Sequence, residues 1–135
     1  VMYARPDLAA LLTPGKHGCT LGGNPICMAA ATAVFDVIER DNLLTHARTL
    51  GGRGTSRLKS DASVSSKIAE VRGRGLFLGI ELKESPQNFN DKALAEGVII
   101  NLTAGKVIRL APPMNISDGD WDEGLSRVIR VIAAL

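Results

Sequence analysis

Two helices are predicted in the first half of the chain, where apolar residues recur at helical spacing. Asn24-Pro25 is a typical helix start, because asparagine can cap the first turn and proline suits the first helical position. The apolar stripe that follows should face a core, and it consists of Ile26, Ala30, Ala33, Val34, Val37 and Ile38. Asp41-Asn42 predicts a break. A second helix should then run to Leu58, although three glycines weaken it.

The second half of the chain shows strand patterns instead. Residues 60–67 are polar and rich in serine, so we expect a surface loop there. Alternating apolar residues then predict two strands, or one strand with a bulge, around a glycine-rich bend at residues 73–75. These apolar residues are Val71, Leu76, Leu78, Ile80 and Leu82. A further strand pair is expected at residues 98–100 and 107–110, joined through residues 103–105.

Two more helices complete the pattern. Residues 91–96 should form a short helix that Gly97 ends. Ser117 is a good cap for the final helix, whose first turn is acidic and therefore suits the helix dipole. Its expected buried face consists of Trp121, Leu125, Val128, Ile129 and Ile132. The sequence therefore predicts an α+β fold, with a small, mainly antiparallel sheet covered by helices on one side and preceded by a long connecting helix.

The amino-terminal segment does not fit this unit. Residues 1–12, with Pro6 near their start, should form a short helix. We expect residues 1–24 to be the trailing edge of another, larger domain. Residues 25–60 would then form the connecting helix region, and residues 61–135 the C-terminal small domain.

Composition narrows the function classes. The chain has 135 residues, is 45% hydrophobic and carries a net charge of only +2, which is too balanced to indicate nucleic-acid binding. No stretch approaches the roughly 20 apolar residues of a membrane span. Two cysteines and two isolated histidines do not make a metal site. We therefore expect a cytoplasmic protein without a metal, although the chain begins at Val1, so the lack of a signal sequence says little.

The strongest local signal is the glycine-rich segment 15–25. Four glycines within residues 15–24 expose backbone N–H groups, and the hydroxyl of Thr20 adds a donor, a combination that suits a phosphate. A glycine-rich connection before a helix remains an alternative. The segment is not a Walker A loop, because His17 follows Gly15-Lys16 where serine or threonine would be needed.

Three blocks of the chain resemble one enzyme family. They are Gly-Lys-His-Gly-Cys-Thr-Leu-Gly-Gly-Asn-Pro at 15–25, Glu-Val-Arg-Gly-Arg-Gly-Leu-Phe-Leu-Gly-Ile-Glu-Leu at 70–82 and Val-Ile-Arg-Leu-Ala-Pro-Pro-Met-Asn-Ile-Ser at 107–117. In sequence, order and spacing they resemble the class III pyridoxal-phosphate-dependent aminotransferases. Within that family the acetylornithine and ornithine aminotransferases are the most similar.

The resemblance implies a fold-type I enzyme and two site residues. Thr20 matches the family threonine that binds the cofactor phosphate of the partner subunit in a homodimer. Cys19 stands where the family has serine or threonine, and a thiol donates only weakly, so we expect a small buried side chain there. Arg109 matches an arginine that pairs with a substrate carboxylate or a gating glutamate, and Leu110 replaces the common phenylalanine. An edge-strand arginine with its head in water remains the alternative for Arg109.

No catalytic residue is expected within this chain. None of its six lysines lies in the family's Schiff-base context; they are Lys16, Lys59, Lys67, Lys83, Lys92 and Lys106. That lysine, and the aspartate that holds the pyridine nitrogen, should precede Val1, so the chain alone should be inactive. The resemblance implies pyridoxal 5'-phosphate as cofactor, amino-acid and 2-oxo-acid substrates, and amino transfer between N-acetylornithine and 2-oxoglutarate in arginine biosynthesis.

Three other functions remain open. The first is a sibling activity on ornithine, succinylornithine, 4-aminobutyrate or succinyl-diaminopimelate. The second is a non-catalytic interaction module. The third is nucleic-acid binding through residues 48–74, which hold seven basic and two acidic side chains but no interleaved aromatics. Among single residues, Arg72 and Arg74 are expected to be solvated turn arginines, and His46 a helix-surface residue.

Overall fold

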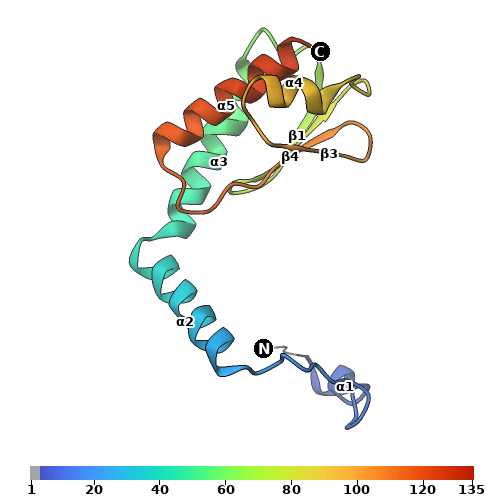
Figure 1. The fold of residues 1–135 in the computed structure, drawn as a ribbon, viewed down its shortest axis with the longest axis vertical. Helices are drawn as coiled ribbons and strands as arrows, with labels where there is room; N and C mark the ends of the chain where they lie inside the picture. Colours follow the sequence, from blue (N-terminus) through green and yellow to red (C-terminus); the bar gives the residue numbers. More distant parts are fainter. Residues whose placement is uncertain (1–3) are drawn as a thin grey trace. The chain divides into compact units, whose positions relative to one another are not determined.

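The computed structural model describes residues 4–135, and these divide into two units on either side of the boundary between Asp36 and Val37 (Figure 1). The first unit contains α1 (Pro6–Ala9) and most of α2 (Pro25–Arg40), which runs across the division. The helix predicted over residues 1–12 is therefore a single turn, and its residues 1–3 lie outside the described part. The expected domain boundaries after residues 24 and 60 stay predictions.

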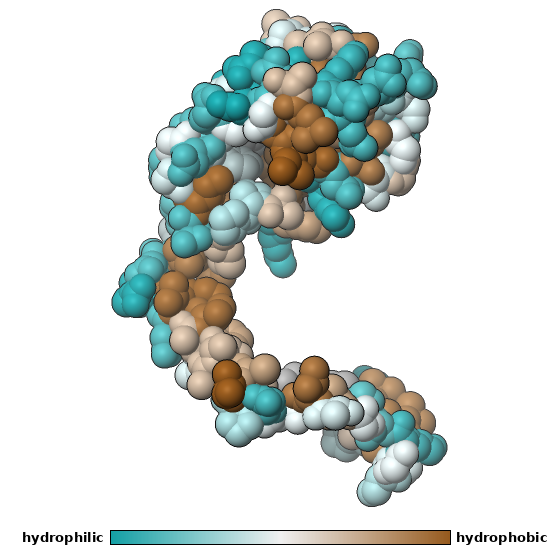
Figure 2. Space-filling model, viewed as in Figure 1, coloured by the Kyte–Doolittle hydropathy of each residue, from teal (hydrophilic) through white to brown (hydrophobic). Residues whose placement is uncertain are grey.

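Helix α2 begins as predicted but buries nothing within this chain. The side-chain oxygen of Asn24 accepts hydrogen bonds from the backbone N–H groups of Ile26 (3.0 Å) and Cys27 (3.3 Å), which confirms the cap. Most of the predicted core-facing stripe is wrong among the described residues, because Ile26 is 80% and Val34 58% exposed; Val37 and Ile38 at its end are half-buried. Hydrophobic colour accordingly runs along α2 on the surface (Figure 2). The helical period identifies a face that needs a partner, but it does not say where the partner lies.

Helix α3 (Leu43–Ser60) contains the glycines that weakened its prediction, and its packing shows why two of them are glycine. The break falls where expected, with Asn42 in the left-handed conformation at φ 49°. A Cβ at position 51 would collide with the carbonyl oxygen of Gly75, and one at position 54 would lie 2.5 Å from the ring of Trp121. These two glycines therefore let the helix backbone pack closely against its neighbours, at the cost of helix propensity.

The sheet has four antiparallel strands in the order β1-β2-β4-β3. They are β1 (Ile68–Arg74), β2 (Phe77–Leu82), β3 (Asn101–Thr103) and β4 (Val107–Leu110). The first hairpin confirms the predicted two strands, and it also has an irregular register between Ile68 and Glu70. The strand predicted at 98–100 is wrong, because β3 starts at Asn101. The register puts residues 98 and 99 opposite residues 112 and 111, beyond the end of β4 at Leu110, where prolines follow, so these two residues have no strand to pair with.

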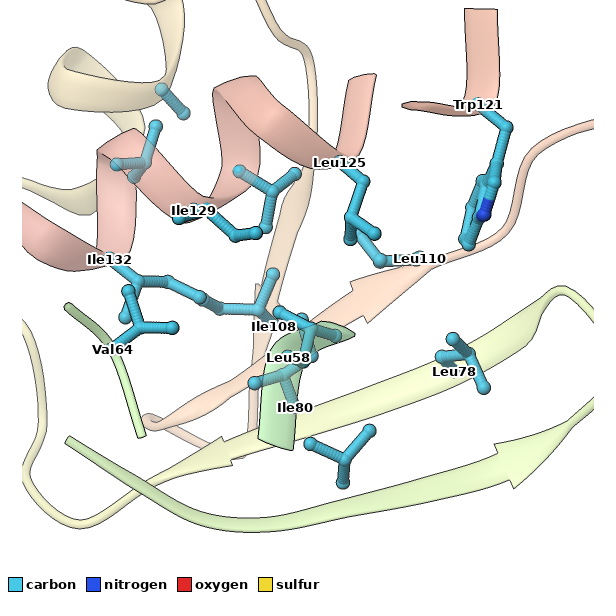
Figure 3. Close-up of a cluster of buried hydrophobic side chains, with 14 of the residues drawn as sticks. Leu58, Val64, Leu78, Ile80, Ile108, Leu110, Trp121, Leu125, Ile129 and Ile132 are labelled. Carbon is cyan, nitrogen blue, oxygen red and sulfur yellow. The ribbon is translucent and has the colours of Figure 1, made fainter. Parts of the chain in front are cut away.

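The core lies between one face of the sheet and helices α3 and α5 (Asp118–Ala133), as Figure 3 shows. Ser117 caps α5 by accepting a hydrogen bond of 3.0 Å from the Asp120 backbone N–H. All five residues of the predicted buried face of α5 are buried. Helix α4 (Phe89–Ala95) adds Phe89 and Ala93 to the core, and it starts two residues earlier than predicted. The α+β fold with helices on one side of a small sheet is confirmed.

Two details of the predicted surface are wrong. Val64, in the serine-rich loop after α3, is 0% exposed, because this one apolar side chain turns into the core (Figure 3). His46 is half-buried, and its Nε2 lies 2.8 Å from the carbonyl oxygen of Ile116, so it joins α3 to the segment before α5. Local sequence patterns reveal neither contact. Val64 is a single apolar residue in a polar segment, and the partner of His46 lies 70 residues away in the sequence.

Candidate functional site

The glycine-rich loop presents Thr20 with its donors free. Gly15 and Gly23 have positive φ angles of 87° and 75°, a conformation that suits glycine. The backbone N–H of Gly22 bonds to the carbonyl of Cys19 at 3.1 Å, which makes a turn around Thr20. Within residues 4–135, neither the hydroxyl nor the backbone N–H of Thr20 has a hydrogen-bond acceptor.

The electrostatics of this loop favour an anion. No acidic side chain occurs between Asp7 and Asp36, whereas Lys16 lies within the loop. A free hydroxyl, free backbone N–H groups and an absence of nearby carboxylates in the sequence together fit a phosphate. Cys19 is exposed, so the expectation of a buried thiol is wrong. The residues present therefore fit the phosphate of the cofactor that the sequence implies.

Arg109 lies on the sheet face that the core helices do not cover. It belongs to β4, where it pairs with Gly79 of β2 on one side and Asn101 of β3 on the other. Its neighbours Ile108 and Leu110 are buried, whereas Arg109 is exposed, as strand alternation requires. β4 is an inner strand, so the edge-strand part of the alternative is wrong, whereas the exposed side chain agrees with a head in water. Among the described residues, no carboxylate lies within 4.0 Å of the Arg109 guanidinium.

A hollow opens beside Arg109. The strands β3 and β4 part after the Asn101–Arg109 pair, and a cavity of about 820 Å³ lies between the parted segments and α5. Arg109 and Asn101 are among its lining residues, together with mainly apolar ones such as Ile100 and Leu110. A mostly apolar hollow with a few polar groups is the usual form of a small-molecule site.

A charge cluster occupies the same sheet face. Nη1 of Arg72 lies 2.9 Å from Glu70 and 2.6 Å from Glu81, and Nζ of Lys106 lies 2.9 Å from Glu81. Hydrogen bonds from Lys106 and Arg72 lower the pKa of Glu81, and those to Glu81 and Glu70 raise the pKa of Arg72. Arg72 is exposed as expected, but it lies in β1 and forms ion pairs, so the expectation of a turn residue is wrong. Sequence reasoning missed the cluster, because Glu81 meets Arg72 only through the cross-strand register.

The candidate residues fall in separate units. Thr20 belongs to the first unit and Arg109 to the second. Three of the six lysines have contacts in the second unit: Lys67 and Lys92 donate to backbone carbonyls at the end of α5, and Lys106 pairs with Glu81. The described residues contain no group of three metal-ligating side chains, and none of their helices is long and apolar enough to cross a membrane.

Comparisons with known proteins agree on one family. The family profile of class-III aminotransferases matches residues 1–132. Ornithine aminotransferase 1 of Staphylococcus saprophyticus is 43% identical over 131 residues, which is 97% of this chain and 32% of that protein. The acetylornithine aminotransferase of Aquifex aeolicus is 42% identical over 131 residues, which is 97% of this chain and 33% of that protein. This chain thus spans about a third of the length of these relatives.

A solved structure supports the same relationship. The ornithine aminotransferase of Toxoplasma gondii, with PLP in partial occupancy at its active site, superimposes with a TM-score of 0.81 at 32% identity. The match covers 95% of this chain and 31% of that one. The fold of residues 4–135 is therefore that of a corresponding third of an aminotransferase.

Proposed function

Because this chain belongs to the class III aminotransferase family, we propose that it forms the C-terminal part of an enzyme that transfers the amino group of N-acetylornithine to 2-oxoglutarate. Ornithine is the second candidate donor, because the similar relatives divide between ornithine and acetylornithine aminotransferases. The observation that carries the proposal is Thr20 in the loop at 15–25, whose hydroxyl and backbone N–H lack acceptors among the described residues. Succinylornithine, 4-aminobutyrate and succinyl-diaminopimelate are sibling donors that the same assay separates.

Thr20 would bind the phosphate of pyridoxal 5'-phosphate. A hydroxyl beside free backbone amides donates well to a phosphate dianion, and the lack of acidic neighbours avoids repulsion. When bound, this cofactor supplies an electron sink that allows a proton to leave the Cα of an amino acid. We further propose that Thr20 serves the cofactor of the partner subunit in a homodimer.

Arg109 would bind a substrate carboxylate. A guanidinium forms two parallel hydrogen bonds to a carboxylate, which fixes the orientation of the substrate as well as its charge. The exposed position of Arg109, with no carboxylate within 4.0 Å of its guanidinium among the described residues, supports this role. A gating glutamate from the rest of the enzyme would be the competing partner when no substrate is bound.

The lysine that holds the cofactor covalently would come from the rest of the enzyme. Lys67, Lys92 and Lys106 are engaged in contacts of the second unit, and Lys16, Lys59 and Lys83 do not lie in the family's sequence context for this role. We therefore propose that the chain supplies binding groups and not the proton shuttle, so the 135 residues alone should not catalyse.

The test is a donor assay on the complete enzyme. N-acetylornithine, ornithine and the sibling donors are compared with 2-oxoglutarate as acceptor, and the proposal expects the highest kcat/KM for N-acetylornithine. Arg109→Ala should raise the KM of a carboxylate substrate about 10- to 100-fold, since a charge-assisted pair is lost. Arg109→Lys keeps the positive charge but not the two parallel donors of the guanidinium, so its KM for a carboxylate substrate should lie between those of the parent and Arg109→Ala. An unchanged KM in Arg109→Ala would contradict the role of Arg109.

The role of Thr20 is tested by cofactor affinity. Thr20→Ala removes the hydroxyl and should weaken pyridoxal-phosphate binding about 5- to 20-fold, whereas Thr20→Ser keeps the hydroxyl and should bind nearly as tightly as the parent. The dissociation constant is measured by equilibrium dialysis of the complete enzyme. Equal affinities in the alanine and serine variants would exclude a hydroxyl contact with the phosphate.

A further inference from the structure

Gly79 lies in the middle of the sheet face that carries Arg109. The strand register places it between Arg72 of β1 and Arg109 of β4. Directly paired residues of antiparallel strands point to the same side, so these three form one row across the sheet. The row lies on the side opposite to the buried residues Leu78 and Ile80. At its centre there is only backbone.

Nothing among residues 4–135 requires glycine at position 79. Its φ is not positive, and a Cβ there would meet its nearest atom, Cγ1 of Val107, at 3.4 Å, which is an ordinary contact. Gly73 is different, because its φ is +147° and a Cβ would collide with the carbonyl oxygen of Phe77. Glycine inside a strand weakens it and often marks a place where a ligand or another backbone comes close. Neither backbone conformation nor packing among the described residues therefore explains why position 79 is glycine.

Side chains of the neighbouring strands border the space above Gly79. The guanidinium of Arg72 is held by Glu70 and Glu81, at 2.9 and 2.6 Å, in the adjacent row. Its Cγ would lie 3.9 Å from a Cβ at position 79, so the arginine stem forms one wall. Val107 forms another, with its Cγ1 at 3.4 Å from that Cβ, and Arg109 is the strand partner of Gly79 on the third side. In the cluster around Glu81, two positive side chains pair with two negative ones, so their charges cancel. Arg109 is therefore the positive charge in this row that can attract an anion.

We propose that Gly79 is a specificity-determining residue, because it leaves a slot in which a substrate carboxylate bound by Arg109 lies against the backbone of β2. We call this space, bounded by Arg72, Val107 and Arg109, the Gly79 slot. It takes the carboxylate end of an amino acid or a 2-oxo acid. A methyl group at position 79 would fill the slot and displace the carboxylate from Arg109. This inference rests on the proposed role of Arg109 and extends it to the residue opposite.

The experiment compares glycine variants of the complete enzyme. Gly79→Ala should raise the KM of the substrates that depend on Arg109 about tenfold, and Gly79→Val should raise it further, while kcat changes less. The unfolding midpoint should not fall, since alanine and valine both favour strands more than glycine does. Gly52→Ala is the matched control, because Gly52 is exposed on α3 with nothing within 4 Å of a Cβ. It should leave every KM unchanged.

A double variant separates failure of the slot from failure of the proposed function. If Arg109→Ala raises the KM and Gly79→Ala does not, the slot is wrong and the role of Arg109 stands. If neither variant changes any KM, the proposed role of Arg109 is wrong, and the slot that depends on it is wrong too. If the slot exists, the fold increases in KM of the two single variants should not multiply in Gly79→Ala/Arg109→Ala, because both substitutions remove the same contact between the substrate carboxylate and Arg109. Multiplying effects, or a lowered unfolding midpoint with an unchanged KM, would overturn the inference and indicate another protein segment above Gly79.

Discussion

The two units differ in how far their residues find partners within the chain. Every residue from 4 to 36 is exposed, including large apolar side chains such as Leu11 and Ile26. Residues 37–135 instead bury a continuous core between the sheet, α3 and α5. A solvent-exposed apolar stripe on a regular helix gains nothing unless something covers it. The second unit therefore buries its apolar side chains within itself, whereas the first carries apolar side chains suited to partners outside the described residues.

The difference has a functional side as well. The glycine-rich loop, which is the most recognisable motif of the chain, lies in the unit whose described residues, 4–36, are all exposed. Arg109 and Gly79, by contrast, are positioned by the strand register of the folded unit. The first unit therefore contributes donors on a loop, and the second contributes a rigid surface. Rigid elements hold binding groups more accurately than loops do.

The largest expected effect contrasts a core leucine with an exposed one. Leu58, which is 0% exposed, lies in the core, whereas Leu11 is 65% exposed in the first unit. Leu58→Ala should reduce the free energy of unfolding by about 2–5 kcal/mol, and Leu11→Ala by less than about 0.5 kcal/mol. Denaturant unfolding followed by the fluorescence of Trp121, the single tryptophan, measures both. Similar losses in the two variants would contradict the division into a packed and an unpacked unit.

Two adjacent glycines of α3 should respond in opposite directions. Gly51→Ala forces a methyl group against the carbonyl of Gly75, so it should destabilise the second unit by about 1–3 kcal/mol. Gly52→Ala has open space and should stabilise the unit by about 0.5–1 kcal/mol through helix propensity. Thermal unfolding of both variants decides the matter. A stabilising Gly51→Ala would show that α3 does not touch the first hairpin as described.

A smaller effect is expected where lysines meet the end of α5. Nζ of Lys67 donates to the carbonyl of Ala133 at 2.6 Å and that of Ile132 at 3.3 Å. A cation there bonds to free carbonyls and opposes the negative end of the helix dipole. Lys67→Met should therefore cost about 0.5–1.5 kcal/mol. Lys59→Met, exposed on α3, is the control and should stay within about 0.5 kcal/mol of the parent in the same unfolding experiment.

The smallest effect concerns pH. The partners Lys106 and Arg72 lower the pKa of Glu81 in the folded state, so its contribution to stability is fully present above the pKa that this carboxyl has in the unfolded chain. That contribution is lost as the pH falls through the lower, folded pKa. Glu81→Gln should therefore be less stable than the parent at pH 6, and the difference should shrink at pH 3. A difference that is equal at both pH values would show that the carboxylate charge is not involved.

The fold of the second unit could largely be predicted from local patterns. The strands at Ile68–Arg74 and Phe77–Leu82, and the buried face of α5, follow from alternation and helical spacing. The misplaced strand at 98–100 shows the limit, since the extent of β3 depends on where β4 ends. The stripe of α2 shows another limit, because spacing marks an apolar face without locating its partner.

The candidate site could be predicted only in part. Thr20 and Arg109 followed from the resemblance to a family, and the structure adds that each lacks a partner among the described residues. The row of Arg72, Gly79 and Arg109 could not be found in sequence, because it depends on the strand register. A glycine with room for a side chain is visible only once its neighbours are placed.

Amide hydrogen exchange on the chain of 135 residues tests the contrast between the two units most directly. We predict strong protection in the core segments at Leu50, Ile80, Ile108 and Ile129, and fast exchange throughout residues 15–24. Protection in residues 15–24 comparable to that of the core would contradict the account, because it would show that the loop finds its partners within this chain.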